Sequence, residues 1–381
     1  MSYSLAGVSC MVTGAGGFLG SRIVQLLLQE EEELTEVRLM DTTFSPELLK
    51  KYEKFQGKTD VKFLKGDIRD AAFLQKACQG LSLVIHAASI IDHQGYLDEE
   101  LVKGINVKGT QLLLEACIQN NVKYFIYTSS VEVMGPNYHG DPIINGNEDT
   151  AYESNHCFPY GQSKKAAEQH VLRANGEALR NGGSLMTCAL RPMYIFGEGC
   201  RFILLHVDDA ILNKNVFLRL SRKEAIVNPV YVGNIAWAHI QAAKAMRNPE
   251  TAKQIEGNFY FISDDTPPIS YSDFYHSLAE ELGFGIESKL AMPLLLQYFL
   301  AFLLQILSTL LKPFVKYVPP FTRHLLNIYH TPFTFSYKKA QQDFGYQPLY
   351  SWEEAKQLTS NWIASVRAPQ GREYLKNGKQ C

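Results

Sequence analysis

The stretch Thr13-Gly14-Ala15-Gly16-Gly17-Phe18-Leu19-Gly20 decides the fold, because it joins an apolar, strand-like run to a helix-like run. The strand candidate Val8–Thr13 precedes the glycines, and the residues after them repeat apolar side chains with helical spacing. Gly14, Gly17 and Gly20 allow a tight turn, a close approach of backbone N–H groups to a pyrophosphate, and close packing of helix on sheet. A strand, a glycine loop and a helix in this order predict the opening unit of a dinucleotide-binding α/β fold.

Strand-like and helix-like segments continue to alternate along the first half of the chain. The strand candidates are Glu36–Asp41, Val61–Lys65, Leu83–His86, Tyr124–Thr128 and Leu185–Arg191, and the helix candidates are Ala71–Cys78, Leu101–Asn120 and Tyr160–Asn175. Strands separated by helices require right-handed crossovers, and therefore a parallel sheet with helices on both faces. The sequence predicts a doubly wound Rossmann domain over residues 1–195. Residues 196–381 are expected to form a smaller C-terminal substrate lobe interleaved with late Rossmann elements.

Composition and charge exclude several classes of protein. Hydrophobic residues make up 46% of the 381 residues, so a sizeable core can form and global disorder is excluded. The 37 basic and 39 acidic side chains leave a formal net charge of −2, which gives no electrostatic footprint for nucleic acid. The 7 cysteines are scattered without a CxxC pair, which argues against a disulfide framework or a structural zinc and for a reducing compartment. No metal is expected.

The acidic residues that follow the second and third strands indicate which dinucleotide is bound. Asp41 ends the second strand, where a carboxylate accepts hydrogen bonds from ribose hydroxyls and repels a 2′-phosphate. This favours NAD over NADP, although a structural aspartate at a strand end would give the same pattern. Asp67 is placed to bind the adenine amine, with Ile68 packing on the ring. Phe18 and Leu19 complete the predicted cofactor contacts at the start of the first helix.

Ser130, Tyr160 and Lys164 form the strongest candidate catalytic group. Tyr160 and Lys164 are four residues apart in a predicted helix, so they project from one face. An ammonium beside a phenol lowers the pKa of the phenol, and the tyrosinate can take a proton from a secondary alcohol as hydride leaves for nicotinamide. Lys164 is also expected to hold the nicotinamide ribose, and Ser130 to hydrogen-bond the alcohol oxygen.

The segment Leu290–Leu311 contains no charged residue. As a helix it would be about 33 Å long, enough to cross the apolar core of a bilayer. Gln297, Ala301, Gln305 and Ser308 fall on one narrow, weakly polar stripe, which fits a helix packed on protein along one side and on lipid along the other. A buried helix over an apolar ligand pocket is the alternative.

Together these residues resemble an extended short-chain dehydrogenase/reductase, and more narrowly the vertebrate 3β-hydroxysteroid dehydrogenase/Δ5-4 isomerase family. The likeness to the broad family lies in the glycine loop, Asp41, Asp67, Asn106–Thr110, Tyr127–Ser130, Tyr160–Lys164 and Arg191–Pro192. The likeness to the narrower family lies in Tyr127–Gly135, Thr187–Gly199, Asn228–His239, Ile262–Pro267 and Phe333–Glu354, and it covers almost the whole chain.

This resemblance implies a pathway role, a location and a second set of site residues. Ser130, Tyr160 and Lys164 would perform the dehydrogenase step, and Tyr260 with Asp264 would supply the acid and base of the isomerase step. From the residues alone, Asp264-Asp265-Thr266-Pro267 equally reads as a strand-end turn with capping aspartates. The family is bound to the membranes of the endoplasmic reticulum and mitochondria, and its apolar segment matches Leu290–Leu311 in position. A homodimer is possible.

The sequence therefore predicts an NAD-dependent, membrane-associated enzyme of steroid biosynthesis. It would oxidise 3β-hydroxy-5-ene steroids to 3-oxo-5-ene steroids and isomerise these to 3-oxo-4-ene steroids. Relatives acting on 27-carbon 3β-hydroxysterols or 4-carboxysterols are the nearest alternative, because Asn147–Thr150 is a stretch associated with the 27-carbon branch. A nucleotide-sugar epimerase is disfavoured by the apolar segment. A non-catalytic dinucleotide-sensing protein is disfavoured by the intact Ser130, Tyr160 and Lys164.

Overall fold

The computed structural model describes residues 4–31, 33–53, 55, 59–93, 95–154 and 158–377. Its centre is a seven-stranded sheet in the order β12-β7-β5-β4-β1-β2-β3, in which all neighbouring strands are parallel. The strands are β1 (Ser9–Thr13), β2 (Glu36–Asp41), β3 (Asp60–Lys65), β4 (Leu83–His86), β5 (Tyr124–Thr128), β7 (Met186–Pro192) and β12 (Phe259–Ile262). β1 and β4 are buried along almost their whole length, as expected of parallel strands covered on both faces.

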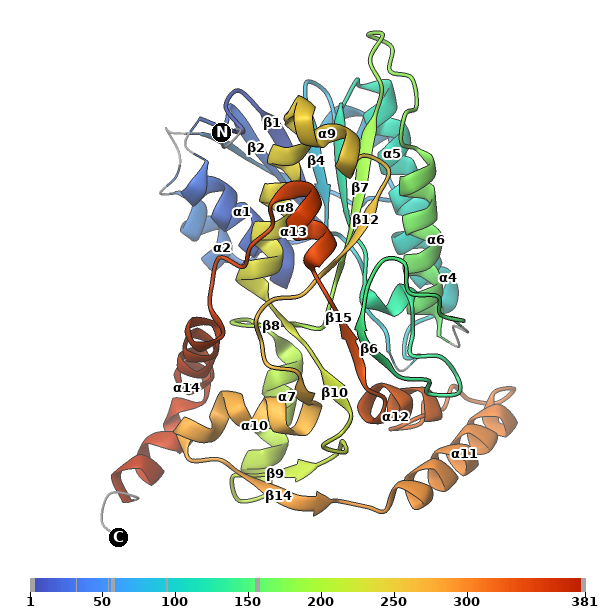
Figure 1. Cartoon of the computed structure of the whole chain (residues 1–381), viewed down its shortest axis with the longest axis vertical. Helices are drawn as coiled ribbons and strands as arrows, with labels where there is room; N and C mark the ends of the chain where they lie inside the picture. Colours follow the sequence, from blue (N-terminus) through green and yellow to red (C-terminus); the bar gives the residue numbers. More distant parts are fainter. Residues whose placement is uncertain are drawn as a thin grey trace.

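Helices cover both faces of this sheet (Figure 1), so the predicted doubly wound Rossmann fold is confirmed. One face packs against α1 (Phe18–Glu30), α8 (Val232–Arg247) and α13 (Lys338–Phe344), with α2 (Pro46–Glu53) and α9 (Pro249–Ile255) beside them. The other packs against α3 (Ala71–Ala77), α5 (Thr110–Gln119) and α6 (Pro159–Arg173). The predicted helix Leu101–Asn120 is α4 (Glu99–Lys103) continued through a π-helical turn, η1 (Gly104–Gly109), into α5.

A smaller lobe follows β7 in the chain. It contains α7 (Arg201–Leu212), α10 (Tyr271–Ala279), the short helix η3 (Glu280–Leu282), the pair β9 (Val216–Arg219) and β14 (Gly285–Leu290), and α14 (Trp352–Asn377). A second sheet has the order β13-β10-β15-β6, formed by Ile269–Ser270, Ile226–Val227, Phe333–Phe335 and Ile143–Gly146, and β8 (Ile195–Phe196) pairs with β11 (Val230–Tyr231). Residues after 195 thus contribute to both units, since β12, α8 and α13 belong to the Rossmann layers.

The apolar segment forms α11 (Leu294–Leu311), a helix that projects from the lobe beside α12 (Arg323–His330) (Figure 1). It starts later than predicted, because Leu290 ends strand β14 and Pro293 precedes the first turn. Only 6% of the helix is buried, although its mean hydropathy is 2.0. The buried helix considered as the alternative is therefore excluded.

The weakly polar stripe of α11 faces protein, as the sequence predicted. Ala301 is fully buried, and the Gln305 Oε1 accepts from Arg323 at 2.7 Å. Ser308 donates to the carbonyl of Tyr317 at 2.7 Å, and the Gln297 Oε1 lies 3.1 Å from a ring nitrogen of His330. The opposite side presents exposed Leu295, Phe299, Phe302, Leu303, Ile306, Leu307 and Leu310.

The cysteines in the described ranges are free and buried: Cys10, Cys78, Cys117, Cys188 and Cys200. Cys157 and Cys381 lie outside the described residues. Within those same ranges, no group of three or more histidine, cysteine or acidic side chains could hold a metal ion.

Candidate functional site

The glycine loop between β1 and α1 is too closely packed for side chains. Gly14 has a φ of +71°, and a Cβ there would lie 2.8 Å from the backbone of Ala88, at the end of β4. A Cβ on Gly20 would collide with the carbonyl of Gly14. Helix α1 begins at Phe18, and its N-cap residue is Gly17. Because glycine has no side chain, no side chain caps the first N–H groups of the helix. The loop therefore brings bare backbone to the start of a helix, which is the arrangement that binds a pyrophosphate.

Asp41 lies at the carboxyl end of β2 and faces this loop. Its Oδ2 accepts from the backbone N–H of Gly16 at 2.9 Å, and its Oδ1 accepts from that of Thr42 at 2.7 Å. Gly16 was not among the predicted cofactor residues, because it falls between the spaced glycines. A Cβ at Gly16 would lie 2.5 Å from the carbonyl of Thr43, so the doubled glycine in the sequence was the available signal.

Phe18 and Leu19 are half-buried at the start of α1, where they pack against the core of the smaller lobe. They lie next to the glycine loop, as predicted. Their side chains also join the Rossmann domain to the lobe, which gives them a structural role as well.

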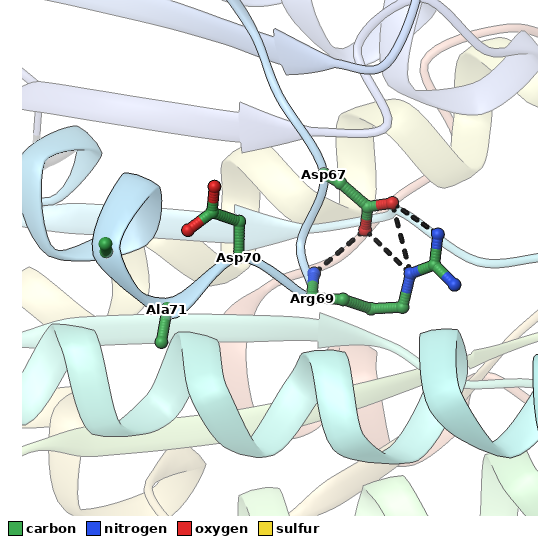
Figure 2. A pocket seen from close by; sticks show the side chains of 5 residues that line it. Asp67, Arg69, Asp70 and Ala71 are labelled. Carbon is green, nitrogen blue, oxygen red and sulfur yellow. Dashed lines mark hydrogen bonds and ion pairs between the residues drawn. The ribbon is translucent and has the colours of Figure 1, made fainter.

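Asp67 borders an open pocket of about 680 Å³ lined by Asp67, Arg69, Asp70, Ala71 and Ala72 (Figure 2). The Arg69 guanidinium forms an ion pair with the Asp67 carboxylate, with Nη2 and Oδ2 2.6 Å apart. This hydrogen-bonded pair lowers the pKa of Asp67. Any contact to an adenine amine must therefore share this carboxylate with Arg69. Ile68 does not line the pocket. It is buried against Gly109 in η1, and its packing on an adenine ring stays a prediction.

Ser130, Tyr160 and Lys164 come together from two elements. Ser130 follows β5, and the other two lie one turn apart at the start of α6. The Ser130 hydroxyl hydrogen-bonds the Tyr160 phenol, and Tyr160 and Lys164 are almost fully buried, at 5% and 3% exposed. Lys164 Nζ donates to the carbonyl of Thr128 at 2.8 Å, and burial lowers the pKa of Lys164 to about 7.

The electrostatics of Tyr160 differ from the prediction of a lowered pKa. Burial, followed by the negative charge of Glu132, raises the pKa of the phenol, and the hydrogen bond from Ser130 offsets only part of this. The Lys164 ammonium is directed at the Thr128 carbonyl, and desolvation weakens its charge. The group is assembled as predicted, but the chain alone holds the phenol in its protonated form.

Two buried polar clusters hold α6, the helix that carries Tyr160 and Lys164, in place. Asn106 in η1 exchanges hydrogen bonds of 2.9 and 3.0 Å with the backbone of Ile90 and donates to Ser163 at 2.9 Å. Glu168 accepts from Ser129 at 2.6 Å and pairs with both ends of the Arg191 guanidinium, at 2.6 and 2.9 Å. The sequence signals for these roles were Asn106–Thr110 and Arg191–Pro192, which carry the family likeness.

Tyr260 and Asp264 are not brought together as an acid–base pair. Tyr260 lies in β12, where its hydroxyl donates to the Gln254 carbonyl at 3.1 Å and lies 3.0 Å from Asp343 in α13. The Tyr260 hydroxyl and the Asp264 carboxylate thus have separate hydrogen-bond partners, and their role in an isomerase step stays a prediction.

The Asp264 carboxylate is occupied by the turn at the end of β12. Oδ2 accepts from the backbone of Tyr231 and from Asn234, both at 2.8 Å, and Oδ1 accepts from Thr266 at 3.0 Å. These bonds join the turn to the start of α8. They favour the strand-end turn that the residues alone also suggested.

The structure adds a carboxylate that the sequence did not single out, beside Tyr160. Glu132 follows Ser130 in the short helix η2 (Val131–Val133), and its Oε1 lies 2.9 Å from His93 Nδ1. The His93 ring meets the Tyr160 ring edge to face, with centroids 5.2 Å apart. The buried side chains of Tyr194 and Tyr271 lie in the same region and pack against each other, with ring centroids 5.2 Å apart.

Comparison with solved structures shows the same fold. MoeE5 in complex with UDP-glucuronic acid and NAD is 20% identical, with a TM-score of 0.66 over 94% of this chain and 99% of that one. The dTDP-glucose 4,6-dehydratase DesIV from Streptomyces venezuelae, solved with NAD, is 18% identical, with a TM-score of 0.68 over 94% and 98%. A UDP-glucuronic acid 4-epimerase mutant from Bacillus cereus is 18% identical, with a TM-score of 0.66 over 94% and 99%.

Comparison with protein families is more specific. The model of the 3-beta hydroxysteroid dehydrogenase/isomerase family matches residues 11–294, from β1 to the first residue of α11. This range contains the glycine loop, Asp41, Ser130, Tyr160 and Lys164. The chain therefore belongs to the 3-beta hydroxysteroid dehydrogenase/isomerase family.

Proposed function

We propose that this protein is an NAD-dependent dehydrogenase of 3β-hydroxy-5-ene steroids that also isomerises the 3-oxo-5-ene product to a 3-oxo-4-ene steroid. The observation that carries the proposal is the joined Ser130, Tyr160 and Lys164 group in a chain of this family. The fold supports NAD as the cofactor, because the glycine loop excludes side chains and Asp41 faces it. NAD is also present in the MoeE5 and DesIV structures.

The catalytic residues have separable tasks. Bound NAD accepts the hydride. Tyr160 takes the hydroxyl proton of the substrate, and Ser130 holds the same oxygen through its hydroxyl. Lys164, with a pKa of about 7, supplies a positive charge that stabilises the tyrosinate and relays its proton. The raised pKa of Tyr160 in the chain alone means that the phenolate forms only when positive charge and substrate are in place.

A rigid, apolar substrate suits the aromatic surroundings of this group. Tyr194 and Tyr271 pack edge to face with centroids 5.2 Å apart, and Tyr271 also packs on Tyr329 at 5.2 Å. The His93 ring packs against the Tyr160 ring on one side and against the Phe202 ring on another. The aromatic walls fit steroid rings better than a charged diphosphate, although 27-carbon sterols and 4-carboxysterols fit the same description.

We also propose that α11 embeds in a membrane of the endoplasmic reticulum or mitochondria without crossing it. Its exposed side is apolar apart from Thr309, whereas its polar stripe contacts α12 and the segment between α11 and α12. The chain then returns to the main body, since β15 pairs with β6 and β10, and α13 packs on β12. A single crossing would place this returning segment on the far side of the bilayer.

A substrate panel tests the proposed reaction. The purified full-length chain is assayed for NADH formation with pregnenolone, a 7α-hydroxylated 27-carbon sterol, a 4-carboxysterol and UDP-glucose. Turnover of pregnenolone above the other compounds supports the proposal. Preferential turnover of either sterol reassigns the substrate within the family, and absence of hydride transfer to NAD with all four compounds favours a dinucleotide-sensing protein.

Membrane association is tested with vesicles of neutral phospholipid. The wild-type chain should float with the vesicles. The triple variant Phe299→Glu, Leu303→Glu and Ile306→Glu should remain in the soluble fraction, because it places charges on the apolar side of α11. A matched triple change to serine should weaken flotation less. Equal flotation of all three proteins would contradict the proposal.

A further inference from the structure

His86 is a fully buried histidine at the carboxyl end of β4, and the catalytic steps above do not use it. Its Nδ1 lies 2.7 Å from the hydroxyl of Thr13, which ends β1, and its Nε2 lies 2.9 Å from the hydroxyl of Thr110, which begins α5. Both ring nitrogens therefore have the partners that a buried polar group needs in place of water. Burial, followed by the positive charge of Lys164, lowers the pKa of His86 to about 3, so the ring is neutral at neutral pH.

The other partners of the two threonines determine which ring nitrogen carries the hydrogen atom. The Thr110 hydroxyl donates its one proton to the Asn106 carbonyl at 2.7 Å, so it accepts from the Nε2–H of His86. The Thr13 hydroxyl accepts from the backbone N–H of Ala88 at 3.2 Å, and its own proton is left for the Nδ1 of His86. These bonds form one directed chain, which fits a neutral ring with its hydrogen on Nε2.

One end of this chain holds the start of the glycine loop. Thr13 directly precedes Gly14, and a Cβ on Gly14 would lie 2.8 Å from the backbone of Ala88. The Thr13 hydroxyl binds the N–H of that same Ala88, and the Thr13 carbonyl accepts from the N–H of Ala87 at 3.3 Å. The hydroxyl therefore fixes the end of β1 against the end of β4 at the point where Gly14 packs.

The other end of the chain holds η1, the π-helical turn between α4 and α5. The Asn106 carbonyl accepts from Thr110, while the Asn106 side chain donates to Ser163 in α6 at 2.9 Å. Ser163 lies between Tyr160 and Lys164 in α6, so the position of η1 affects that of the helix that carries them. One imidazole therefore connects the glycine loop with the helix that carries the tyrosine and the lysine.

His86 also packs as a core ring, and this is the simpler explanation of its burial. Its ring centroid lies 5.9 Å from that of Phe125 and 5.6 Å from that of Tyr127. Packing of this kind requires a ring shape, which phenylalanine would supply. Two directed hydrogen bonds require an acceptor and a donor at fixed places, which the phenylalanine side chain lacks. The two explanations therefore predict different responses to substitution.

We propose that His86 is a positioning residue of the dehydrogenase, which keeps the glycine loop in register with the helix that carries Tyr160 and Lys164. The inference rests on the proposed function, because hydride transfer to NAD is the step that needs this register. The glycine loop would hold the cofactor and Tyr160 the substrate oxygen, so separate elements bring the two reactants together. A displacement of about 1 Å between such elements lowers a rate by about 100-fold.

Steady-state NADH formation from pregnenolone by the full-length enzyme tests this role. His86→Phe keeps a ring and removes both hydrogen bonds, so kcat should fall about 10- to 100-fold while KM for NAD changes less than about threefold. His86→Gln restores an acceptor and a donor, and it should recover part of kcat. Wild-type kcat in His86→Phe overturns the inference.

His276 in α10 offers a matched control for the loss of a histidine hydrogen bond. It donates to the carbonyl of Phe284 in the smaller lobe at 3.1 Å. His276→Phe should leave kcat unchanged. A fall in kcat equal to that of His86→Phe would show that the effect is not specific to the chain of bonds through His86, and would overturn the inference.

Thr13→Val and Thr110→Val break the chain at its two ends while keeping the shape of each side chain. The effects of substitutions that share no partner usually add as free energies, whereas these two hydroxyls share the imidazole of His86. The double variant should therefore lose little more kcat than either single variant. Losses that multiply would show that the two threonines act independently, and would overturn the inference. If His86→Phe does not fold, this pair of variants replaces it.

The tautomer of His86 gives a readout that does not depend on the substrate. The full-length enzyme, labelled with nitrogen-15 in its histidines, is measured by NMR in detergent, and the His86 signals are identified by their absence in His86→Gln. We expect a neutral ring with its hydrogen on Nε2. Thr110→Val removes the acceptor of this hydrogen, so the Nδ1 tautomer should become populated in that variant. A hydrogen on Nδ1 in the wild type overturns the directed chain and the inference with it.

The proposed function fails separately. A wild-type enzyme that forms no NADH from pregnenolone contradicts the proposed function, whichever tautomer His86 adopts. A wild-type enzyme that forms NADH, while His86→Phe keeps the wild-type kcat, leaves the dehydrogenase assignment standing and overturns the role of His86.

Discussion

Asn106 donates from its amide nitrogen to the hydroxyl of Ser163 across 2.9 Å, which ties the π-helical turn η1 to the helix that carries Tyr160 and Lys164. The same amide holds the backbone of Ile90, just after β4. One buried side chain therefore fixes the distance between the loop that precedes His93 and α6.

We predict that Asn106→Ala lowers both stability and turnover. It leaves the Ile90 backbone groups without their partner, which costs about 1–3 kcal/mol for a buried group. The loss of position should reduce kcat about 10- to 100-fold with a smaller change in KM for NAD. Asn106→Asp keeps the acceptor to Ile90 N–H but loses both donated bonds, so it should not restore activity. Thermal unfolding and steady-state kinetics check this, and wild-type kcat in Asn106→Ala would contradict the positioning role.

Tyr160 and Lys164 should act as one unit in hydride transfer. Tyr160→Phe removes the oxygen that receives the proton, and we expect kcat to fall by several orders of magnitude. Lys164→Ala should cost about as much, and the double variant little more, because groups that act in one step are not additive. Single-turnover NADH formation is the measurement. Independent, multiplicative losses in the double variant would show that the two residues serve different steps.

Lys164 should be needed for activity although its burial lowers the free energy of unfolding. Its pKa is about 7 in the folded chain against about 10.5 when exposed, so between these values the unfolded chain binds a proton that the folded chain does not. The free energy of unfolding should therefore rise as pH increases from 7 towards 10. Below pH 7 the destabilisation caused by burying Lys164 should not change with pH. Lys164→Met removes this cost, which is of the order of a few kcal/mol, while the lost donor to Thr128 offsets part of the gain.

The measurement is the difference in Tm between Lys164→Met and the wild type across this pH range. We expect the variant to be inactive and more stable at pH 7, with a stability advantage that shrinks by pH 9.5. A Tm difference that does not change with pH would mean that Lys164 is charged in the folded protein.

Asp41 should determine the choice between NAD and NADP. Asp41→Ala removes the carboxylate that would repel a 2′-phosphate, and adding Thr42→Arg supplies a positive partner for it. We expect kcat/KM for NADP to rise relative to NAD in the double variant. Some loss of NAD affinity should accompany Asp41→Ala, because Asp41 also holds the N–H of Gly16. A wild type that already prefers NADP would contradict the assignment.

The parts of the fold that follow from local pattern were predictable. The parallel strands and crossover helices depend on alternating apolar runs, and Glu36–Asp41 and Leu83–His86 occur with the predicted bounds. The polar stripe of α11 was also predictable, because helical spacing alone puts Gln305 and Ser308 on one side. The spacing of residues within one helix or strand can be read directly from the sequence.

The parts that depend on packing between distant segments were not predictable in this way. The bond from Asn234 to Asp264 and that from Tyr260 to Asp343 join elements far apart in the chain, and they give structural partners to residues expected to be catalytic. The approach of His93 to Glu132 likewise depends on two loops after different strands. The raised pKa of Tyr160 was not predicted for the same reason, because it comes from burial and from the Glu132 charge.

The most direct test of the central claim follows a single hydrogen. The enzyme is given NAD and pregnenolone that carries deuterium at carbon 3, and the reduced cofactor is analysed by mass spectrometry. The account predicts that the deuterium appears in NADH with wild-type enzyme and is not transferred by Tyr160→Phe at a comparable rate. Reduced cofactor without deuterium, or equal transfer by Tyr160→Phe, would contradict the claim that this site oxidises the 3β-hydroxyl of a steroid.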